Sequence, residues 1–353
     1  MKKLKIGVIG VGNISSTHIE GYLNNSDCEL YAFCDINEKT LKAKGEKYGV
    51  KRLYTDHKKM LEELPELDAV SVCTWNNAHA ECSIDALNAG KHVFCEKPMA
   101  MSEAQALEMK KAAEKAGKVL GIGFVRRHGK DAVLARDLIE NGKAGEIYYG
   151  KATYIRRNGN PGGWFGNKAL SGGGPLIDLG VHVIDLAKYI AGNPKAISVF
   201  GATFTKLYNR IELKDKKAYV SADYRGKDDI CDVEDLATAM IRFDNGFVLS
   251  VETSYSLNVG QDEGKVELFG TKGGIKIAPS LTFYTEYEGR LADISFPGAT
   301  AFDGSEYALE IDNFISAIKN GTPLVADADD GIELMKILDA IYESARTGHE
   351  VIL

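Results

Sequence analysis

The feature that most constrains the fold is a strand, turn, helix and strand pattern at the start of the chain. Residues 5–10 (Lys-Ile-Gly-Val-Ile-Gly) form a short apolar run, which is typical of a strand buried on both faces of a parallel sheet. The run passes into a glycine-containing turn, residues 10–15, and then into a predicted helix over residues 14–24. A second apolar run, residues 30–34, ends in Asp35. This order predicts that the chain begins with a βαβ unit.

Each part of this unit has a physical reason in dinucleotide binding. Gly10 permits a tight turn, and Gly12 lets the backbone approach a pyrophosphate lying on the helix N-terminus. Ser15 replaces the usual third glycine and is small enough for close packing of the helix on the strand. Asp35 is placed to accept hydrogen bonds from the adenosine ribose and to repel a 2′-phosphate. The pattern predicts a nicotinamide dinucleotide site that prefers NAD to NADP; the alternative is a βαβ turn without a ligand.

Strands and helices continue to alternate after Asp35. Strands are predicted over residues 51–54, 68–73, 91–95 and 118–121. Helices are predicted over residues 38–48, 57–63 and 103–116, and a further helix follows residues 74–79 and ends at residue 89. Asp56 is expected to cap the second of these helices and Ser102 the helix over residues 103–116. This alternation predicts a doubly wound, mostly parallel sheet. Ligands bind beyond the carboxyl ends of the strands in such sheets. Residues 10–12, 74–76 and 96–97 all follow strands, so we expect them to converge.

The pattern changes at residue 123. Strands are predicted over residues 146–154, 196–204, 237–243, 247–254, 264–269 and 274–277, and helices up to residue 140 and over residues 176–186, 306–319 and 330–346. A long glycine-rich loop, residues 155–175, contains Trp164, which we expect to cover the substrate, because long loops in compact domains are often functional. We therefore expect a dinucleotide-binding domain of residues 1–123 and an α/β domain of residues 124–353.

Composition excludes several classes of partner. The 353-residue chain has a net charge of −7, which argues against a nucleic-acid or anionic-membrane surface. It has no apolar run long enough to span a bilayer. The six cysteines are scattered, without a C-x-x-C pair or zinc spacing, which predicts reduced thiols in a cytoplasmic protein and no metal site.

Three residues have the chemistry that a dehydrogenase needs beside nicotinamide. Moving a hydride from a carbinol carbon requires a base for the hydroxyl proton and a group that stabilises the developing oxyanion. Asp178 and His182 are four positions apart on a predicted helix and share one face, although such a pair is often only structural. Lys97 lies at the carboxyl end of a strand. We assign His182 as the base, Lys97 as the electrostatic partner and Asp178 as the orienting residue.

The motifs also follow one another in a specific order. They are Gly10-x-Gly12 with Asp35, Thr74-x-Asn76-x-x-His79, Glu96-Lys97-Pro98, Gly123-Phe124-x-x-Arg127 and Gly172-Gly173-Gly174-x-Leu176-x-Asp178-x-Gly180-x-His182. In this order the chain resembles the glucose–fructose oxidoreductase, inositol dehydrogenase and rhizopine-catabolism (Gfo/Idh/MocA) family. The resemblance covers essentially the whole sequence.

The resemblance implies an α/β protein with an N-terminal Rossmann domain and a C-terminal domain built on a large, mostly antiparallel open sheet, which often forms homodimer or homotetramer contacts. It implies NAD(P)-dependent hydride transfer at a carbinol carbon of a sugar, cyclitol or sugar derivative. It implies the same catalytic trio, and it leaves open whether the lysine and the histidine share or exchange their roles. The residues expected to bind the cofactor are Gly10, Gly12, Asn13, Ile14, Asp35, Thr74, Asn76, His79, Glu96, Lys97 and Arg127, and those expected to bind substrate are Lys97, Arg127, Trp164, Asp178 and His182.

Two kinds of alternative remain open. Glu96 either contacts the cofactor or fixes the ammonium of Lys97, and His79 is expected to orient its helix near the nicotinamide. At the level of function, a dehydrogenase or reductase competes with a glycosidase that keeps NAD bound and acts by transient oxidation and elimination. A non-catalytic nucleotide-binding regulator is the third hypothesis, and the joint presence of Lys97, Asp178 and His182 speaks against it.

Overall fold

The computed structural model describes residues 3–207, 210, 213, 219–278, 280–300 and 303–353. The chain forms two compact units. The first contains Met1–His128 and Gly304–Ile332, and the second contains Gly129–Asp303 and Glu333–Leu353. The first unit is therefore assembled from two stretches that are far apart in the sequence.

Six parallel strands form the sheet of the first unit, as far as its residues are described, in the order β3-β2-β1-β4-β5-β6. Their bounds are β1 (Leu4–Ile9), β2 (Cys28–Cys34), β3 (Arg52–Tyr54), β4 (Ala69–Val72), β5 (His92–Glu96) and β6 (Leu120–Gly123). All residues of β4 and β6 are buried, which explains why their sequences are almost continuously apolar. The predicted doubly wound sheet is confirmed. Its strand order reverses between β1 and β4, where such sheets bind ligands.

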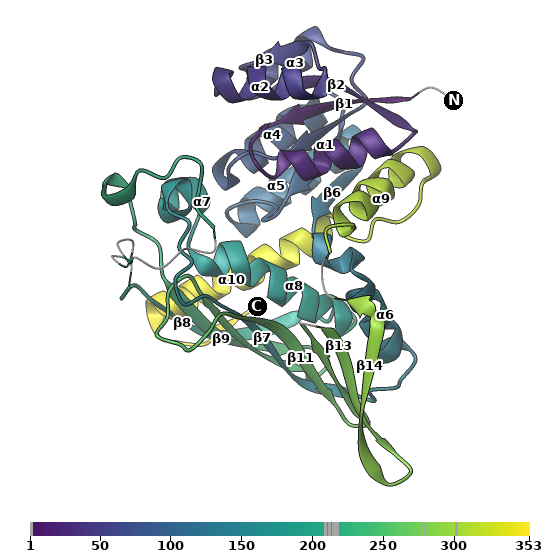
Figure 1. The fold of residues 1–353 in the computed structure, drawn as a ribbon, viewed down its shortest axis with the longest axis vertical. Coiled ribbons are helices and arrows are strands. Elements are labelled where there is room, and N and C mark those ends of the chain that lie inside the picture. Colours follow the sequence, from purple (N-terminus) through teal and green to yellow (C-terminus); the bar gives the residue numbers. More distant parts are fainter. Residues whose placement is uncertain (1–2, 208–209, 211–212, 214–218, 279, 301–302) are drawn as a thin grey trace. The chain divides into compact units, whose positions relative to one another are not determined.

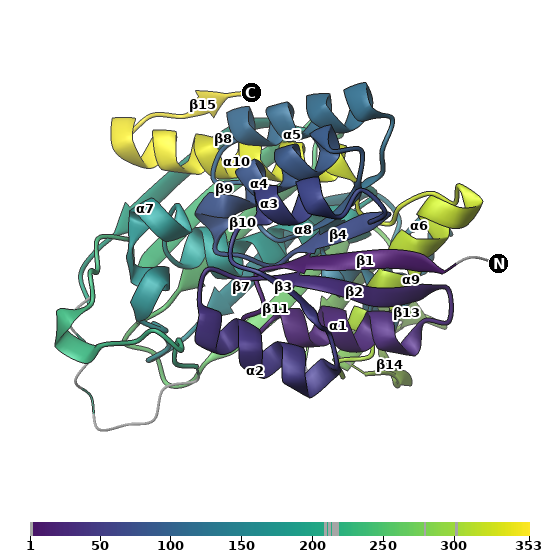
Figure 2. The ribbon, with the colours of Figure 1, turned by 90° about the horizontal axis from the view of Figure 1, so that it is seen from above.

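Helices cover both faces of this sheet, with α1 and α2 on one face and α3, α4 and α5 on the other (Figure 2). The bounds are α1 (Ser15–Asn24), α2 (Glu38–Tyr48), α3 (His57–Glu63), α4 (Asn76–Asn88), α5 (Glu103–Ala116), a 3-10 turn η1 (Val125–His128) and α9 (Glu306–Asn320). Both predicted caps are confirmed. The Asp56 carboxylate accepts the Lys58 N–H at 2.8 Å, and the Ser102 hydroxyl accepts the Gln105 N–H at 3.3 Å.

Helix α9 packs beside α1 (Figure 1). Gly21 of α1 allows this close approach, because a Cβ at that position would lie 2.9 Å from Cγ1 of Ile311. Ile311 and Phe314 of α9 belong to a buried cluster that also contains Ile6 of β1 and Phe94 of β5. Helix α9 is thus part of the hydrophobic core of the first unit.

Nine strands of the second unit, within the described residues, form its sheet in the order β14-β13-β12-β11-β7-β10-β9-β8-β15. Their bounds are β7 (Ile147–Ile155), β8 (Ala196–Phe204), β9 (Leu236–Phe243), β10 (Val248–Ser254), β11 (Glu263–Gly270), β12 (Gly273–Ile277), β13 (Ser280–Tyr287), β14 (Arg290–Thr300) and β15 (Val351–Ile352). Neighbours pair antiparallel except β7 and β10, which are parallel. The predicted large, mostly antiparallel sheet is confirmed.

Strands β13 and β14 were not expected from the sequence. They form a hairpin whose turn places Glu288 at φ 50° and Gly289 at φ 71°. A tight hairpin turn with both central residues at positive φ usually has Asn or Asp at the first position. Glu288 at that position therefore does not predict a hairpin turn. The strand pattern is weak as well, because Leu291 is 95% exposed and Pro297 lies within β14, at the edge of the sheet.

Helices α8 and α10 lie on the same face of the second sheet (Figure 1). The helical bounds here are α6 (Lys130–Glu140), a 3-10 turn η2 (Gly163–Gly166), α7 (Lys168–Ser171), a π-helical turn η3 (Leu176–Gly180), α8 (Val181–Ile190), a 3-10 turn η5 (Gly226–Asp228) and α10 (Ala328–Thr347). The helix predicted over residues 176–186 therefore begins with a wider π turn, a feature frequent at functional sites.

All six cysteines are free thiols, five of them buried. A search of the described residues for a helix long and apolar enough to cross a bilayer finds none.

Candidate active site

The glycine turn after β1 is held from two sides. Gly10 has a φ of +82°, and a Cβ there would lie 2.7 Å from the carbonyl carbon of Cys73, so no side chain fits. Asp35, which follows β2, accepts the Val11 N–H at 2.8 Å with one carboxylate oxygen and the Asn37 N–H at 2.8 Å with the other. The acid expected to bind a ribose thus also shapes the turn. Each of its oxygens keeps a lone pair for a further donor.

The turn itself presents an open backbone. Gly12 and Asn13 are exposed, and among the described residues no atom beyond the chain neighbours lies within 4 Å of a Cβ built on Gly12. Ile14 is half-buried and precedes α1. Ser15 is fully buried, and its hydroxyl donates to the Gly12 carbonyl at 2.7 Å. Exposed backbone at a helix N-terminus fits a dinucleotide pyrophosphate.

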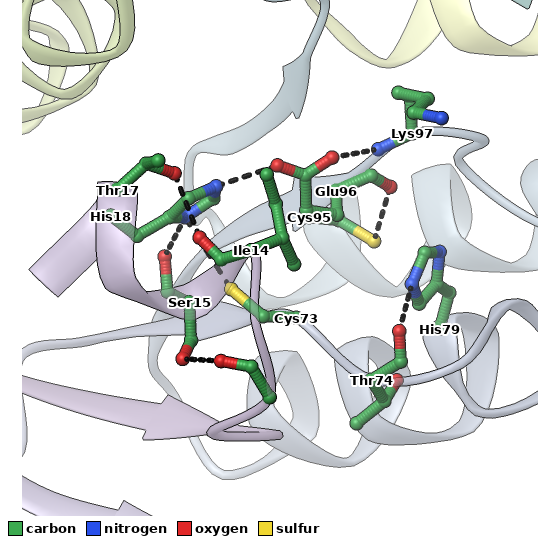
Figure 3. Close-up of polar contacts among 12 residues, drawn as sticks. Ile14, Ser15, Thr17, His18, Cys73, Thr74, His79, Cys95, Glu96 and Lys97 are labelled. Carbon is green, nitrogen blue, oxygen red and sulfur yellow. Dashed lines mark hydrogen bonds and ion pairs between the residues drawn. The ribbon is translucent and has the colours of Figure 1, made fainter. Parts of the chain in front are cut away.

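His79 joins the loops that follow β4 and β5, and Figure 3 shows its contact with Thr74. Its Nδ1 lies 2.7 Å from the Pro98 carbonyl oxygen, and its Nε2 lies 3.1 Å from the Thr74 carbonyl oxygen. The ring is 1% exposed, and burial lowers the pKa of His79. His79 is therefore a brace between two strand ends. Because Gly10 also lies against the backbone of Cys73, the three segments predicted to converge do lie together.

Strand β5 ends in a buried carboxylate beside the predicted catalytic lysine. Glu96 is 6% exposed; its Oε2 accepts the Lys97 N–H at 3.0 Å, and its Oε1 lies 2.7 Å from Nε2 of His18 on α1 (Figure 3). Burial acts to raise the pKa of Glu96, but the hydrogen bond and charge of His18 and the charge of Lys97 lower it, and the net shift is downward. This placement supports the alternative in which Glu96 is a partner of Lys97.

Two other residues expected at the cofactor are buried. Asn76, the first residue of α4, is 6% exposed. The side chain of Arg127 has 0% exposure, and its Nη1 donates to the Val325 carbonyl at 2.9 Å and to Oδ2 of Asp330 at 2.7 Å. Arg127 therefore forms a buried ion pair, and its expected contacts with cofactor and substrate stay predictions.

In the second unit, the glycine run before α8 allows two close approaches. A Cβ on Gly173 would lie 2.0 Å from the Tyr342 hydroxyl oxygen, and one on Gly174 would lie 2.1 Å from the Glu234 carbonyl oxygen. The Glu234 carboxylate accepts the N–H groups of Gly174 at 3.0 Å and Leu176 at 3.2 Å, and the hydroxyl of Tyr342 at 3.0 Å. Glu234 thereby satisfies backbone donors at the start of the helix that carries Asp178.

Asp178 and His182 are the accessible residues of this helix. Every residue from Gly173 to Lys188, a stretch described without gaps, is buried except these two, which are half-buried. Asp178 lies in the π turn and His182 in the first turn of α8. An acid and an imidazole that share the open face of an otherwise buried helix can bind a hydroxyl group and remove its proton.

The surroundings of Asp178 are polar and buried. The hydroxyl of Tyr255, a fully buried residue, donates to Oδ2 of Asp178 at 3.0 Å. Burial, followed by the charge of Asp178, raises the pKa of Tyr255 well above its usual value, so it remains a donor. Burial acts to lower the pKa of Arg156, but Tyr154 and Asp178 raise it and the net shift is upward. Asp178 thus lies beside a hydroxyl donor and near a guanidinium cation.

The loop that contains Trp164 is tied down by two aspartates. Asp223 accepts the Trp164 N–H at 3.0 Å, and Asp229 accepts the Gly163 N–H at 2.7 Å. The Trp164 ring is half-buried and lies 4.0 Å, between centroids, from the ring of Phe165. The loop therefore has a defined conformation, and the covering role of Trp164 stays a prediction.

Glu234 and Tyr255 were not identified from the sequence. Glu234 precedes β9 and Tyr255 follows β10, and the pairing of Leu236 with Ser254 places both at the same end of this hairpin. The one available signal was their position at strand ends. A polar residue at a strand end is too common for that signal to single them out.

Two family models match the chain. Residues 4–124 match the NAD-binding Rossmann fold of the Gfo/Idh/MocA oxidoreductases, and residues 136–353 match the C-terminal α/β domain of the same family.

Characterised proteins resemble the chain over nearly its whole length. It is 36% identical over 351 residues to a D-glucoside 3-dehydrogenase of Escherichia coli K12, covering 99% of this chain and 97% of the relative. It is 29% identical over 341 residues to a myo-inositol 2-dehydrogenase of Thermotoga maritima, covering 93% and 92%. A solved levoglucosan dehydrogenase in complex with NADH has a TM-score of 0.86 at 25% identity, covering 99% of both chains.

Proposed function

This chain belongs to the Gfo/Idh/MocA family of oxidoreductases, and from that membership we propose that it oxidises one secondary hydroxyl of a pyranose ring, with glucosides as the favoured substrates. It is an NAD-binding oxidoreductase that acts on CH–OH groups, as its sugar and inositol dehydrogenase relatives are named. The observation that carries the proposal is the open face of the π-turn helix, where Asp178 and His182 are the accessible residues.

We assign the three polar residues to separate tasks. His182 removes the proton of the reacting hydroxyl, and Lys97 stabilises the negative charge that develops on that oxygen. Asp178, which accepts a hydrogen bond from the Tyr255 hydroxyl, orients the imidazole or a substrate hydroxyl. NAD, when bound, accepts the hydride from the carbinol carbon. Glu96 holds the backbone of Lys97 by accepting its N–H at 3.0 Å.

The preferred cofactor is NAD. Asp35 places a carboxylate where the adenosine ribose of a dinucleotide binds in this fold, and its charge opposes a 2′-phosphate. The backbone N–H groups that already bind Asp35 hold the carboxylate in place.

Self-association through the second sheet accompanies this function in our proposal. Large apolar side chains are exposed on its strands, including Phe200 (52%), Met240 (43%) and Tyr148 (53%), and Phe200 pairs with Met240 across β8 and β9. Exposed apolar groups that adjoin one another are typical of protein interfaces. A homodimer or homotetramer built on this sheet would cover them. Free, mostly buried thiols support a cytoplasmic location.

The test is a substrate panel of glucosides, free sugars, inositols and anhydro sugars, followed by NADH absorbance. Chromogenic glucosides are included so that the released aglycone is measured in parallel. We expect NADH to form in proportion to oxidised sugar, with the best kcat/KM for a glucoside. Aglycone release without net NADH would instead identify the glycosidase alternative, and failure of every polyol to react would contradict the proposal.

A further inference from the structure

A cluster of three ionisable side chains lies in the core of the first unit. His18 comes from α1, Glu96 from the end of β5 and Glu310 from α9, and they are 0%, 6% and 2% exposed. One ring nitrogen of His18 and one carboxyl oxygen from each glutamate lie within 4.8 Å of one another. Burying two carboxyl groups side by side is costly unless one of them is neutral or both are compensated.

The two glutamates of the cluster differ in their hydrogen-bond partners. Glu96 receives the Lys97 N–H at 3.0 Å and lies 2.7 Å from Nε2 of His18. Both oxygens of Glu310 are buried and have no hydrogen-bond partner within the described part of the chain. Donors stabilise a charged carboxylate, whereas a carboxyl group without donors in an apolar site favours its protonated form. The geometry therefore puts the negative charge on Glu96 and the proton on Glu310.

A chain of hydroxyl groups supports His18 as a donor to Glu96. The oxygen of Ser71 lies 2.9 Å from Nδ1 of His18 and 3.0 Å from the Tyr22 hydroxyl. Every group is satisfied when Tyr22 donates to Ser71, Ser71 donates to Nδ1, and the Nε2–H of His18 donates to Glu96. His18 is thereby fixed in the orientation that places its N–H on the carboxylate.

The neighbouring titratable groups agree with this distribution of charge. Burial raises the pKa of Glu310 well above its usual value, and the charge of Glu96 adds to the effect. Burial likewise raises the pKa values of Tyr22 and Cys73, and it lowers that of His79. These groups are neutral near pH 7, and Lys97 is a nearby cation whose charge lowers the pKa of Glu96.

We propose that His18 and Glu310 are positioning residues for the active site, because together they keep Glu96 as the single negative charge of a buried carboxyl pair. Glu310 holds the proton, His18 donates to the carboxylate, and the charged carboxylate holds the backbone of Lys97 and attracts its ammonium. This inference rests on the proposed role of Lys97. It gives a role to α9, whose sequence carries none of the family motifs.

The kinetic test compares two substitutions of His18 in the full-length protein. His18→Leu removes the donor to Glu96, so the pKa of Glu96 rises. Protonation of Glu96 then adds to protonation of the base His182 on the acid limb of the pH–kcat profile, and the limb becomes steeper and moves to higher pH. A shift of about one pH unit lowers kcat about tenfold on that limb. NAD affinity should change by less than twofold. His18→Gln restores a donor of similar reach and should return the limb toward its wild-type position. A limb that does not move in a folded His18→Leu protein would overturn the proposal.

The second test needs no enzymatic turnover, so it separates this inference from the proposed function. An infrared difference spectrum at neutral pH between wild type and Glu310→Gln should show the carbonyl band of a protonated carboxylic acid. Asp312→Asn, an exposed change on the same helix, should leave that band in place. Absence of the band would overturn the proposal. So would one equivalent of a divalent cation that copurifies with wild type and is lost in Glu310→Gln, because a cation would then replace the proton.

Discussion

At the scale of single residues, Asp35 shows how one side chain serves two purposes. The position of an acid after the second strand predicts ribose recognition, and the structure adds that its oxygens accept the N–H groups of Val11 and Asn37. Substitution therefore acts both on the ligand contact and on the shape of the glycine turn. Lys97 and His182 differ from Asp35 in this respect, since their assigned tasks concern the reacting hydroxyl alone.

Asp35→Ser should narrow the preference between the two cofactors. We expect wild type to bind NAD at least tenfold more tightly than NADP, about 1.4 kcal/mol, because the carboxylate repels a 2′-phosphate. In the variant, NAD affinity should fall more than NADP affinity. Calorimetric titration measures both dissociation constants. Glu29→Gln also removes one negative charge, at an exposed position on β2, and serves as the control. Equal affinities in wild type would refute the preference.

Lys97→Ala and His182→Ala should each lower kcat roughly a hundredfold or more while NAD affinity stays nearly constant, as expected for loss of an oxyanion stabiliser or a general base. Steady-state rates combined with NAD titration separate the two quantities. The double variant should lose less than the product of the single losses, because the two residues serve one chemical step. Unchanged rates in folded single variants would show that other residues carry the chemistry.

At the scale of elements, the helix that bears Asp178 and His182 depends on how its N-terminus is held. Gly173 and Gly174 let the chain pass close to Tyr342 and Glu234, and the Glu234 carboxylate accepts two backbone N–H groups there. The π turn follows directly. Its position is thus maintained by a buried acid that comes from a different part of the chain.

Glu234→Gln should weaken this arrangement. The amide has one oxygen, so the variant leaves at least one of the N–H groups of Gly174 and Leu176 without its acceptor, which costs about 1–3 kcal/mol of unfolding free energy. We expect a lower Tm and a lower kcat with unchanged NAD affinity. Glu252→Gln, an exposed position on β10, is the matched control. Wild-type stability and rates in Glu234→Gln would argue against this role.

Trp164→Phe tests the loop before the catalytic helix. If the indole covers the substrate, the variant should raise KM for sugar several-fold and leave NAD affinity unchanged, because the loss of indole contacts affects the sugar alone. Stopped assays at varied sugar concentration and NAD titration supply the two values. Kinetics identical to those of wild type would show that Trp164 does not contact the substrate.

At the scale of the whole molecule, the residues to which we assign roles in the reaction are divided between the two units. The first unit carries the glycine turn, Asp35 and Lys97, and the second carries Asp178 and His182. The second unit also presents exposed apolar side chains on its sheet, such as Phe200 and Met240 on neighbouring strands. We expect these residues to be covered by another copy of the chain.

Phe200→Glu should reduce the molecular mass measured by light scattering, because a charge at the centre of an apolar contact must be desolvated on association. Leu107→Glu, at a 39% exposed position on α5 in the first unit, is the control and should keep the wild-type mass. An unchanged mass for Phe200→Glu would place the interface elsewhere or show that the protein is a monomer.

The sequence alone determined the features that depend on neighbours in the chain. Alternating apolar runs and helical stretches predicted the first sheet and six strands of the second. The glycines with Asp35 predicted the turn and its ligand class, because periodicity and turn chemistry are local. Folding along a parallel sheet then brings the strand ends together, so the convergence of Gly10, Thr74 and Lys97 followed from topology.

Only the tertiary structure decided which distant residues surround the site. Helix α9 packs on α1 and buries Glu310 near Glu96, and Glu234 and Tyr255 reach the helix of Asp178. Arg127, for which contacts with the ligand stay a prediction, pairs with Asp330 from a distant part of the chain. These contacts depend on burial and hydrogen bonding between segments far apart in the chain. Neither hydrophobic periodicity nor motif spacing predicts which buried polar groups form hydrogen bonds with one another.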